Sequence, residues 1–148
     1  MALLEELQGL YQAYREQFQQ QERARKPLSG VFGLGAGPGD APCHQQFSQE
    51  LERLLEDAAA RGLPSGEIRQ ALEFIYRDPQ ELRGSRENAV YWMLLAAHRL
   101  TLPLAAQLDP ADAGALYEAY QRDYPRRNRL PAQKEVSAAL GERGKSRT

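Results

Sequence analysis

The feature that most constrains the fold of this chain is the spacing of its apolar residues, which recur every three or four positions over long stretches. That spacing places them along one side of an α-helix, which has about 3.6 residues per turn. The clearest stripes are Leu4, Leu7, Tyr11, Tyr14 and Phe18, then Phe47, Leu51, Leu54, Leu55 and Ala58, and then Ile68, Ala71, Leu72 and Ile75. Because no segment shows convincing strand alternation, the sequence predicts helices that bury these stripes against one another.

The first stripe allows two interpretations. Apolar residues at this spacing also form the seam of a coiled coil. The stripe fades after Phe18 into three consecutive glutamines, which is short of the roughly three to four heptads that indicate a coiled coil. We therefore favour a helix over about residues 2–25 that packs onto its own domain.

Proline, glycine and capping residues predict where the next helices begin and end. Pro42 suits the first turn of a second helix, and Gly62 followed by Pro64 ends it. Ser65 starts a third helix, which should finish near Asp78 because the next residue is proline. The second and third helices therefore form a hairpin.

The second half of the chain predicts further helices. Ser85 can cap a fourth helix. The middle of this helix, residues 89–97, is apolar on all sides, which is typical of a helix at the centre of a bundle. We therefore expect Trp92 to fill the core. Pro103 bends or breaks this helix. The clearest helix start in the sequence is Asp109-Pro110, and Pro125 ends the helix that begins there. A short last helix spans about residues 132–140.

Length and composition complete the predicted fold. A chain of 148 residues with 42% hydrophobic and 26% charged residues has the size and balance of one globular domain. We predict an all-α fold, a compact bundle of five to six helices with a Gly-rich loop between the first and second helices. The whole chain, 1–148, forms a single helical domain, in which 27–42 is the Gly/Pro-rich loop and 125–148 a basic tail with a short helix.

Several features predict where the protein resides. A single cysteine excludes an intramolecular disulfide, which suits a reducing compartment. The N-terminal residues are acidic, unlike a signal peptide. The longest apolar stretch is also shorter than the roughly 20 residues of a membrane-spanning helix. We expect a soluble, cytoplasmic protein with no membrane association.

The Gly-rich segment is the first candidate binding site. Gly35, Gly37, Gly39 and Asp40 lead to the start of the second helix, where free N–H groups attract phosphate or carboxylate groups. The segment matches neither a dinucleotide-binding fingerprint nor a phosphate-binding loop. We favour a surface connection whose glycines allow tight turns.

Cys43, His44 and His98 extend this candidate site. A thiol at a helix start can have a lowered pKa and act as a nucleophile or a metal ligand. Adjacent residues on a helix point about 100° apart, so His98 is the better partner for Cys43, if the fold brings the two together. One cysteine and two histidines are one ligand short of a usual zinc site, so we predict no metal and no cofactor. A histidine on an apolar face, such as His98, is more often a core residue.

The C-terminal segment is the candidate for nucleic-acid binding. Residues 122–148 carry 8 basic and 3 acidic side chains, whereas residues 1–121 carry 11 and 17. Arg126, Arg127 and Arg129 form a basic group that could contact phosphates. The domain as a whole is not basic, so we favour a solvated tail, or one that docks on the acidic body.

The sequence shows no catalytic constellation, although amphipathic helices and a long loop are present. We therefore expect a non-enzymatic interaction or binding module whose partner is another protein or a second copy of itself. The alternatives are an enzyme or a ligand- or metal-binding protein with its site at the Gly-rich loop, Cys43 and His44, and a nucleic-acid-binding protein.

Overall fold

The computed structural model describes residues 2–32, 42–125, 127 and 129–145. Within these residues every regular element is a helix, so the all-α prediction is confirmed. The elements are α1 (Leu3–Phe32), α2 (Pro42–Arg61), α3 (Ser65–Tyr76), η2 (Gln80–Leu82), α4 (Asn88–Ala96), η3 (Ala97–Thr101), α5 (Leu102–Ala105), α6 (Pro110–Asp123) and α7 (Pro131–Lys145), where η marks a 3₁₀ helix.

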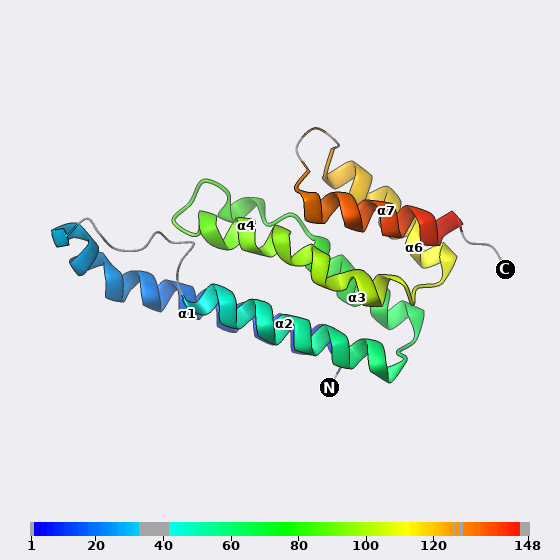
Figure 1. The fold of residues 1–148 in the computed structure, drawn as a ribbon, viewed down its shortest axis with the longest axis horizontal. Coiled ribbons are helices and arrows are strands. Elements are labelled where there is room, and N and C mark those ends of the chain that lie inside the picture. Colours follow the sequence, from blue (N-terminus) through cyan, green and yellow to red (C-terminus); the bar gives the residue numbers. More distant parts are fainter. Residues whose placement is uncertain (1, 33–41, 126, 128, 146–148) are drawn as a thin grey trace.

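The helices are arranged as two pairs with a layer between them (Figure 1). Helices α1 and α2 lie side by side along one edge, and the hairpin of α6 and α7 lies at the other. Between the pairs run α3 and the continuous helical segment formed by α4, η3 and α5. This middle layer therefore contacts both pairs and joins them through one core.

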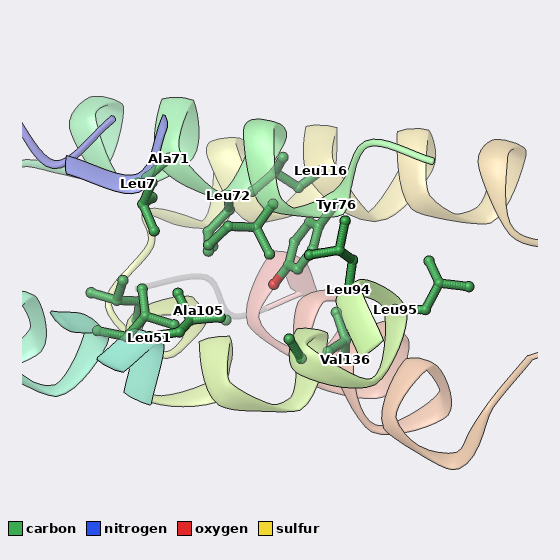
Figure 2. Close-up of a cluster of buried hydrophobic side chains, with 14 of the residues drawn as sticks. Leu7, Leu51, Ala71, Leu72, Tyr76, Leu94, Leu95, Ala105, Leu116 and Val136 are labelled. Atoms are coloured by element: carbon green, nitrogen blue, oxygen red, sulfur yellow. The ribbon is translucent and has the colours of Figure 1, made fainter. Parts of the chain in front are cut away.

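The core draws its side chains from every long helix (Figure 2). Leu7, Leu51, Leu72, Leu116 and Val136 are each at most 4% exposed, and they come from α1, α2, α3, α6 and α7 respectively. Burying one such side chain fully contributes about 1.5–3 kcal/mol, so this shared core is the main source of stability. The predicted apolar stripes of the first three helices supply most of these side chains, but the buried face of α1 begins at Leu3 and not at the predicted Leu4.

The starts of α3 and α6 are held together by polar side chains. Ser65 Oγ donates a hydrogen bond to Asp112 Oδ2 at 2.5 Å and accepts one from the Asp109 backbone N–H at 2.8 Å. Arg69 completes the junction with a 3.1 Å ion pair to Asp112. Asp109 is the N-cap residue of α6, but its side chain forms no capping hydrogen bond. Cross-helix contacts replace that local cap.

Helix α1 is longer than predicted. We expected it to end near Arg25 and the Gly/Pro-rich loop to begin at Pro27, whereas α1 continues to Phe32. A proline inside a helix removes one backbone hydrogen bond and can kink the helix without ending it. Residues 27–32 therefore belong to α1, and the remainder of the predicted loop, up to residue 41, lies outside the described residues.

The basic C-terminal segment is not a peripheral tail. Helix α7 runs from Pro131 to Lys145, and it packs along α6 and against η3, α5 and α4. The prediction of a short helix within a tail was therefore wrong. The apolar stripe of α7 is weak, so the sequence did not indicate how many side chains this helix buries. Its buried residues are Ala132, Gln133, Val136, Ser137 and Leu140.

Candidate functional site

The predicted site at the Gly-rich segment cannot be assembled from the described residues. Gly35, Gly37, Gly39 and Asp40 all lie outside them. The rest of this predicted site, Cys43 and the two histidines, is described and can be followed individually.

Cys43 lies in the first turn of α2 and is fully buried. Burial raises the pKa of its thiol, and the acidic side chain of Glu22 acts in the same direction. Hydrogen bonds from backbone N–H groups at the helix start oppose this shift without overcoming it. The hypothesis of an activated thiolate is therefore not supported, because a buried thiol with a raised pKa is a poor nucleophile.

His44 is buried between α1 and α2, with 4% of its surface exposed. Its Nδ1 shares a short hydrogen bond with the hydroxyl of Tyr14, and its ring contacts the rings of Tyr14 and Phe18. Tyr14 in turn stacks on Phe47, at 4.2 Å between ring centroids. His44 therefore belongs to an aromatic cluster that attaches α2 to α1.

His98 occupies a different aromatic cluster. It lies in η3, is fully buried, and shares a 2.7 Å hydrogen bond between its Nδ1 and the hydroxyl of Tyr120. Its ring also contacts Tyr76 and Tyr124. Burial lowers the pKa of His98 to about 3, although the backbone of Ile75 opposes this shift. His98 is therefore neutral at physiological pH.

A chain of hydrogen bonds continues from this second cluster. The hydroxyl of Tyr76 shares a 2.7 Å hydrogen bond with Thr101 Oγ1, which donates to the carbonyl of His98 at 2.7 Å. Tyr124 donates its hydroxyl to the carbonyl of Tyr76 at 2.5 Å. These contacts link α3, η3 and α6, so the polar groups around His98 hold the core together instead of opening toward a ligand.

The two histidines do not form a common site with Cys43. His44 packs against side chains of α1, whereas His98 packs against side chains of α3 and α6 and the residue after α6. Among the described residues, no three His, Cys, Asp or Glu side chains are grouped as a metal ion would require. The geometry therefore gives no basis for a shared catalytic or metal centre within this part of the chain.

The predicted basic group is also divided. Arg126 lies outside the described residues, and Arg127 is exposed. Arg129 is half-buried, and its Nε donates to the Tyr124 carbonyl at 2.8 Å. Its other nitrogens donate to Ser137 and Gln121, so this guanidinium fastens the α6–α7 connection. Of the two arginines that the structure describes, Arg127 is the one that lies openly on the surface.

A surface that the sequence analysis missed lies on α4. Trp92, which we expected in the core, is 43% exposed and is the one large apolar side chain exposed to this degree among the described residues. Ala96, one turn further along the helix, is also exposed. The polar residues Asn88 and Arg99 lie at helical spacing on the same side, and they were the available signal that this face meets solvent.

We define the outer stripe as the apolar residues that continue this face along α4, η3 and α5. The outer stripe consists of six residues. Three of them are partly buried against the core, namely Ala89, Met93 and Leu100. The other three are exposed, namely Trp92, Ala96 and Pro103. The six residues recur at helical spacing over about four turns. Trp92 is the one large side chain of the stripe that is exposed.

The charges near the outer stripe are mostly positive. Arg83 and Arg86 precede α4, are exposed, and form no ion pair within the described part of the chain. The single acidic residue between 83 and 108, Glu87, is directed onto α1, where it pairs with Arg15 at 3.1 Å. Arg99 pairs with Glu135 of α7 at 2.7 Å. Arg83 and Arg86 are therefore exposed cations that precede the stripe and form no ion pair among the described residues.

No helix within the described ranges is long and apolar enough to cross a membrane. Comparison of the chain with protein-family models, with curated proteins and with solved structures finds no match.

Proposed function

We propose that this protein is a non-enzymatic interaction module that binds an amphipathic, acidic helix of another protein along the outer stripe. The main support for the proposal is that the side chain of Trp92, on the apolar helix α4, is exposed to solvent. Tryptophan is the residue type most enriched among the few side chains that supply most of the binding energy of protein interfaces.

The shape of the stripe favours a helical partner. Its residues extend over about four turns of one rod, and an amphipathic helix contacts such a face through apolar residues spaced at i, i+3, i+4 and i+7. Ala96 presents only a methyl group beside Trp92, so the backbone of a partner helix can come close there. Trp92 then packs against the side of the docked helix.

Charge favours an acidic partner over a second copy of this chain. Arg83 and Arg86 offer two exposed cations at one end of the stripe. In a second copy that paired stripe to stripe, Glu87 and Glu135 would be poor partners for these arginines, because both are already in ion pairs. Charge complementarity mainly sets specificity and association rate, and the apolar stripe supplies most of the affinity.

Trp92 also provides the assay, because it is the single tryptophan of the chain. A designed helical peptide with leucines at i, i+3, i+4 and i+7 and flanking glutamates is titrated into the full chain while tryptophan emission is recorded. We expect a saturable blue shift as Trp92 leaves water. The same peptide with lysines in place of the glutamates should bind at least several-fold more weakly, because it repels Arg83 and Arg86.

Two matched variants localise the contact. Ala96→Glu places a charge inside the stripe and should abolish the blue shift. Ala60→Glu makes the same change at an exposed alanine of α2, so it should leave the shift intact. The absence of a shift with either peptide would contradict the proposal. Sedimentation that shows self-association of the free chain, lost in Ala96→Glu, would instead identify a second copy as the occupant.

A separate experiment at Cys43 tests the non-enzymatic part of the proposal. Cys43 is the single cysteine of the chain and was considered as a nucleophile in the sequence analysis. Because the thiol is fully buried and its pKa is raised, we expect a chromogenic disulfide reagent to modify it only as fast as the protein unfolds. Rapid modification of the folded chain at neutral pH would contradict a purely structural role and reopen the enzymatic alternative.

A further inference from the structure

A groove of about 410 Å³ lies between α6 and α7, away from the outer stripe. Six of the residues that line it are Tyr117, Gln121, Arg129, Lys134, Ser137 and Lys145. Three of the six are cationic, and the only acidic residue in its lining is Glu142. The groove therefore has an excess of two positive charges.

Arg129 is the fixed cation of this groove. Its Nε donates to the Tyr124 carbonyl at 2.8 Å, its Nη1 donates to Ser137 Oγ at 3.1 Å, and its Nη2 donates to Gln121 Oε1. All three acceptors are neutral, and Arg129 forms no ion pair with any described residue. The guanidinium is thus held in place, half-buried, without a counter-ion, while one N–H on each terminal nitrogen is left to donate.

Ser137 supplies a second donor beside this guanidinium. Its side chain is 5% exposed, and its Oγ accepts hydrogen bonds both from Arg129 and from Gln121 Nε2, the latter at 2.7 Å. A hydroxyl group that accepts two hydrogen bonds still has its own proton to donate. Within these contacts Ser137 finds no acceptor for that proton, so an acceptor in the groove would complete its hydrogen bonding.

The neighbouring groove between α3 and α6 shows why the missing counter-ion matters. That groove, of about 420 Å³, is also lined by three arginines, Arg69, Arg77 and Arg122. Each of these arginines lies within 4.0 Å of a carboxylate. Arg69 pairs with Glu73 and Asp112, Arg77 pairs with Glu81, and Arg122 pairs with Asp123. Its cations are already neutralised, whereas Arg129, Lys134 and Lys145 have no carboxylate partner within the described residues.

We infer that the α6–α7 groove binds the dianion of a phosphate monoester. A guanidinium matches two phosphate oxygens with parallel N–H groups, and the Ser137 hydroxyl can donate to a third. Lys134 and Lys145 then balance the charge from the rim. Glu142 disfavours a longer polyanion such as a nucleic-acid strand, because its carboxylate would repel the next phosphate group. Tyr117, which also lines the groove, offers an aromatic ring to the organic part of the ligand.

The test is calorimetric titration of the full chain at low salt with two probes, inorganic phosphate and phenyl phosphate, which share the oxyanion but differ in the organic part. We expect both to bind at one site, and phenyl phosphate to bind more tightly. Tyr117→Leu should weaken phenyl phosphate alone. Tighter binding of inorganic phosphate would contradict an organic ligand.

Charge variants then assign the site. Arg129→Gln should weaken both probes by about tenfold or more, since it removes charge-assisted hydrogen bonds. Because Arg129 also fastens the α6–α7 connection, two exposed changes provide the decisive readout without disturbing the fold. The double change of Lys134→Gln with Lys145→Gln should weaken binding by roughly two- to fivefold, and Glu142→Gln should strengthen it. Arg122→Gln is the matched control in the neutralised groove and should change neither probe.

Three results would overturn the inference. The first is the absence of saturable binding of both probes at low salt. The second is binding that responds to Arg122→Gln but not to Glu142→Gln. The third is single-stranded RNA that binds more tightly than phenyl phosphate, with a salt dependence that indicates several phosphate contacts. That third result would make the groove part of a nucleic-acid surface instead.

Discussion

Helices α4 and α7 divide their residues between core and solvent in opposite ways. Helix α4 is the most apolar helix of the bundle, yet Trp92 and Ala96 face solvent. Helix α7 carries five charged residues in its 15 positions, yet it buries Gln133 and Ser137 along with its apolar side chains. The burial of a helix therefore depends on how many other elements pack against it, and less on its own composition. Helix α7 packs along α6 and against η3, α5 and α4, whereas nothing within the described residues covers the outer face of α4.

The largest effect should come from the core face of α7. Leu140 is fully buried, so Leu140→Ala leaves a cavity and should lower the free energy of unfolding by about 2–5 kcal/mol. Urea denaturation measures this change. Glu142→Ala, two residues further on an exposed position of the same helix, should alter it by no more than about 0.5 kcal/mol. Equal, small losses in both variants would show that α7 is a loosely attached tail after all.

The next effect concerns His98, which connects η3 to α6 through its hydrogen bond with Tyr120. Below pH 6.5 the unfolded chain takes up a proton at this histidine, whereas the folded chain does not until about pH 3. The folded state therefore loses about 1.4 kcal/mol for each pH unit as pH falls through this window, and its stability is fully retained above it.

Urea denaturation at pH 7.5 and pH 4.5 measures that loss. His98→Asn keeps a polar group near Tyr120 but cannot take up a proton, so its stability should fall less between the two pH values. The same pH dependence in both proteins would rule out His98 as its source and assign the loss to the acidic side chains.

A smaller effect is expected where α7 approaches α6 most closely. A Cβ atom on Gly141 would lie 2.8 Å from Cε1 of Tyr117, so the ring would have to move. Gly141→Ala should destabilise the protein by about 1 kcal/mol, even though alanine favours helix more than glycine does. Gly9→Ala, in α1, meets no atom within 4 Å and should instead stabilise it by up to about 1 kcal/mol. Thermal denaturation compares the two, and stabilisation by Gly141→Ala would mean that the α6–α7 contact is looser than described.

The smallest effect should occur on the outer face of α4. Ala96 is exposed, so Ala96→Glu should change the free energy of unfolding by no more than about 0.5 kcal/mol while it disrupts the proposed docking of a partner helix. The adjacent Ala97 is 4% exposed, and Ala97→Glu should be strongly destabilising because it buries a charge. Chemical denaturation of this pair separates the two faces, and similar losses in both would contradict the exposure of the outer stripe.

Much of the fold was predictable because helical spacing is a local property. The end of α2 at Arg61 and the start of α3 at Ser65 follow from Gly62 and Pro64, and Gly62 adopts a φ of 64°, which glycine accommodates without strain. The start of α6 at Pro110 was equally clear. The end of α1 was missed because a proline can either stop or kink a helix, and the local sequence does not distinguish these outcomes.

The candidate sites were far less predictable. The chemistry of Cys43 depends on whether it faces solvent, and the fold buries it and raises its pKa. Arg129 was interpreted as part of a basic surface group, but its partners, Gln121 and Ser137, lie eight residues away on each side and meet it only because α6 and α7 form a hairpin. The outer stripe was hidden because every residue from Ala89 to Ala97 is apolar, so composition alone indicated a helix covered on all sides.

The amphipathic helices of this chain, and the places where most of them start and stop, follow from its sequence, because these properties depend on residues within a few turns of one another. The covered faces, the pairing of each histidine with a tyrosine, and the arginine that lacks a carboxylate partner became known from the three-dimensional fold. Those outcomes depend on the packing of segments that are remote in the chain, and spacing along one helix carries no information about what lies across from it.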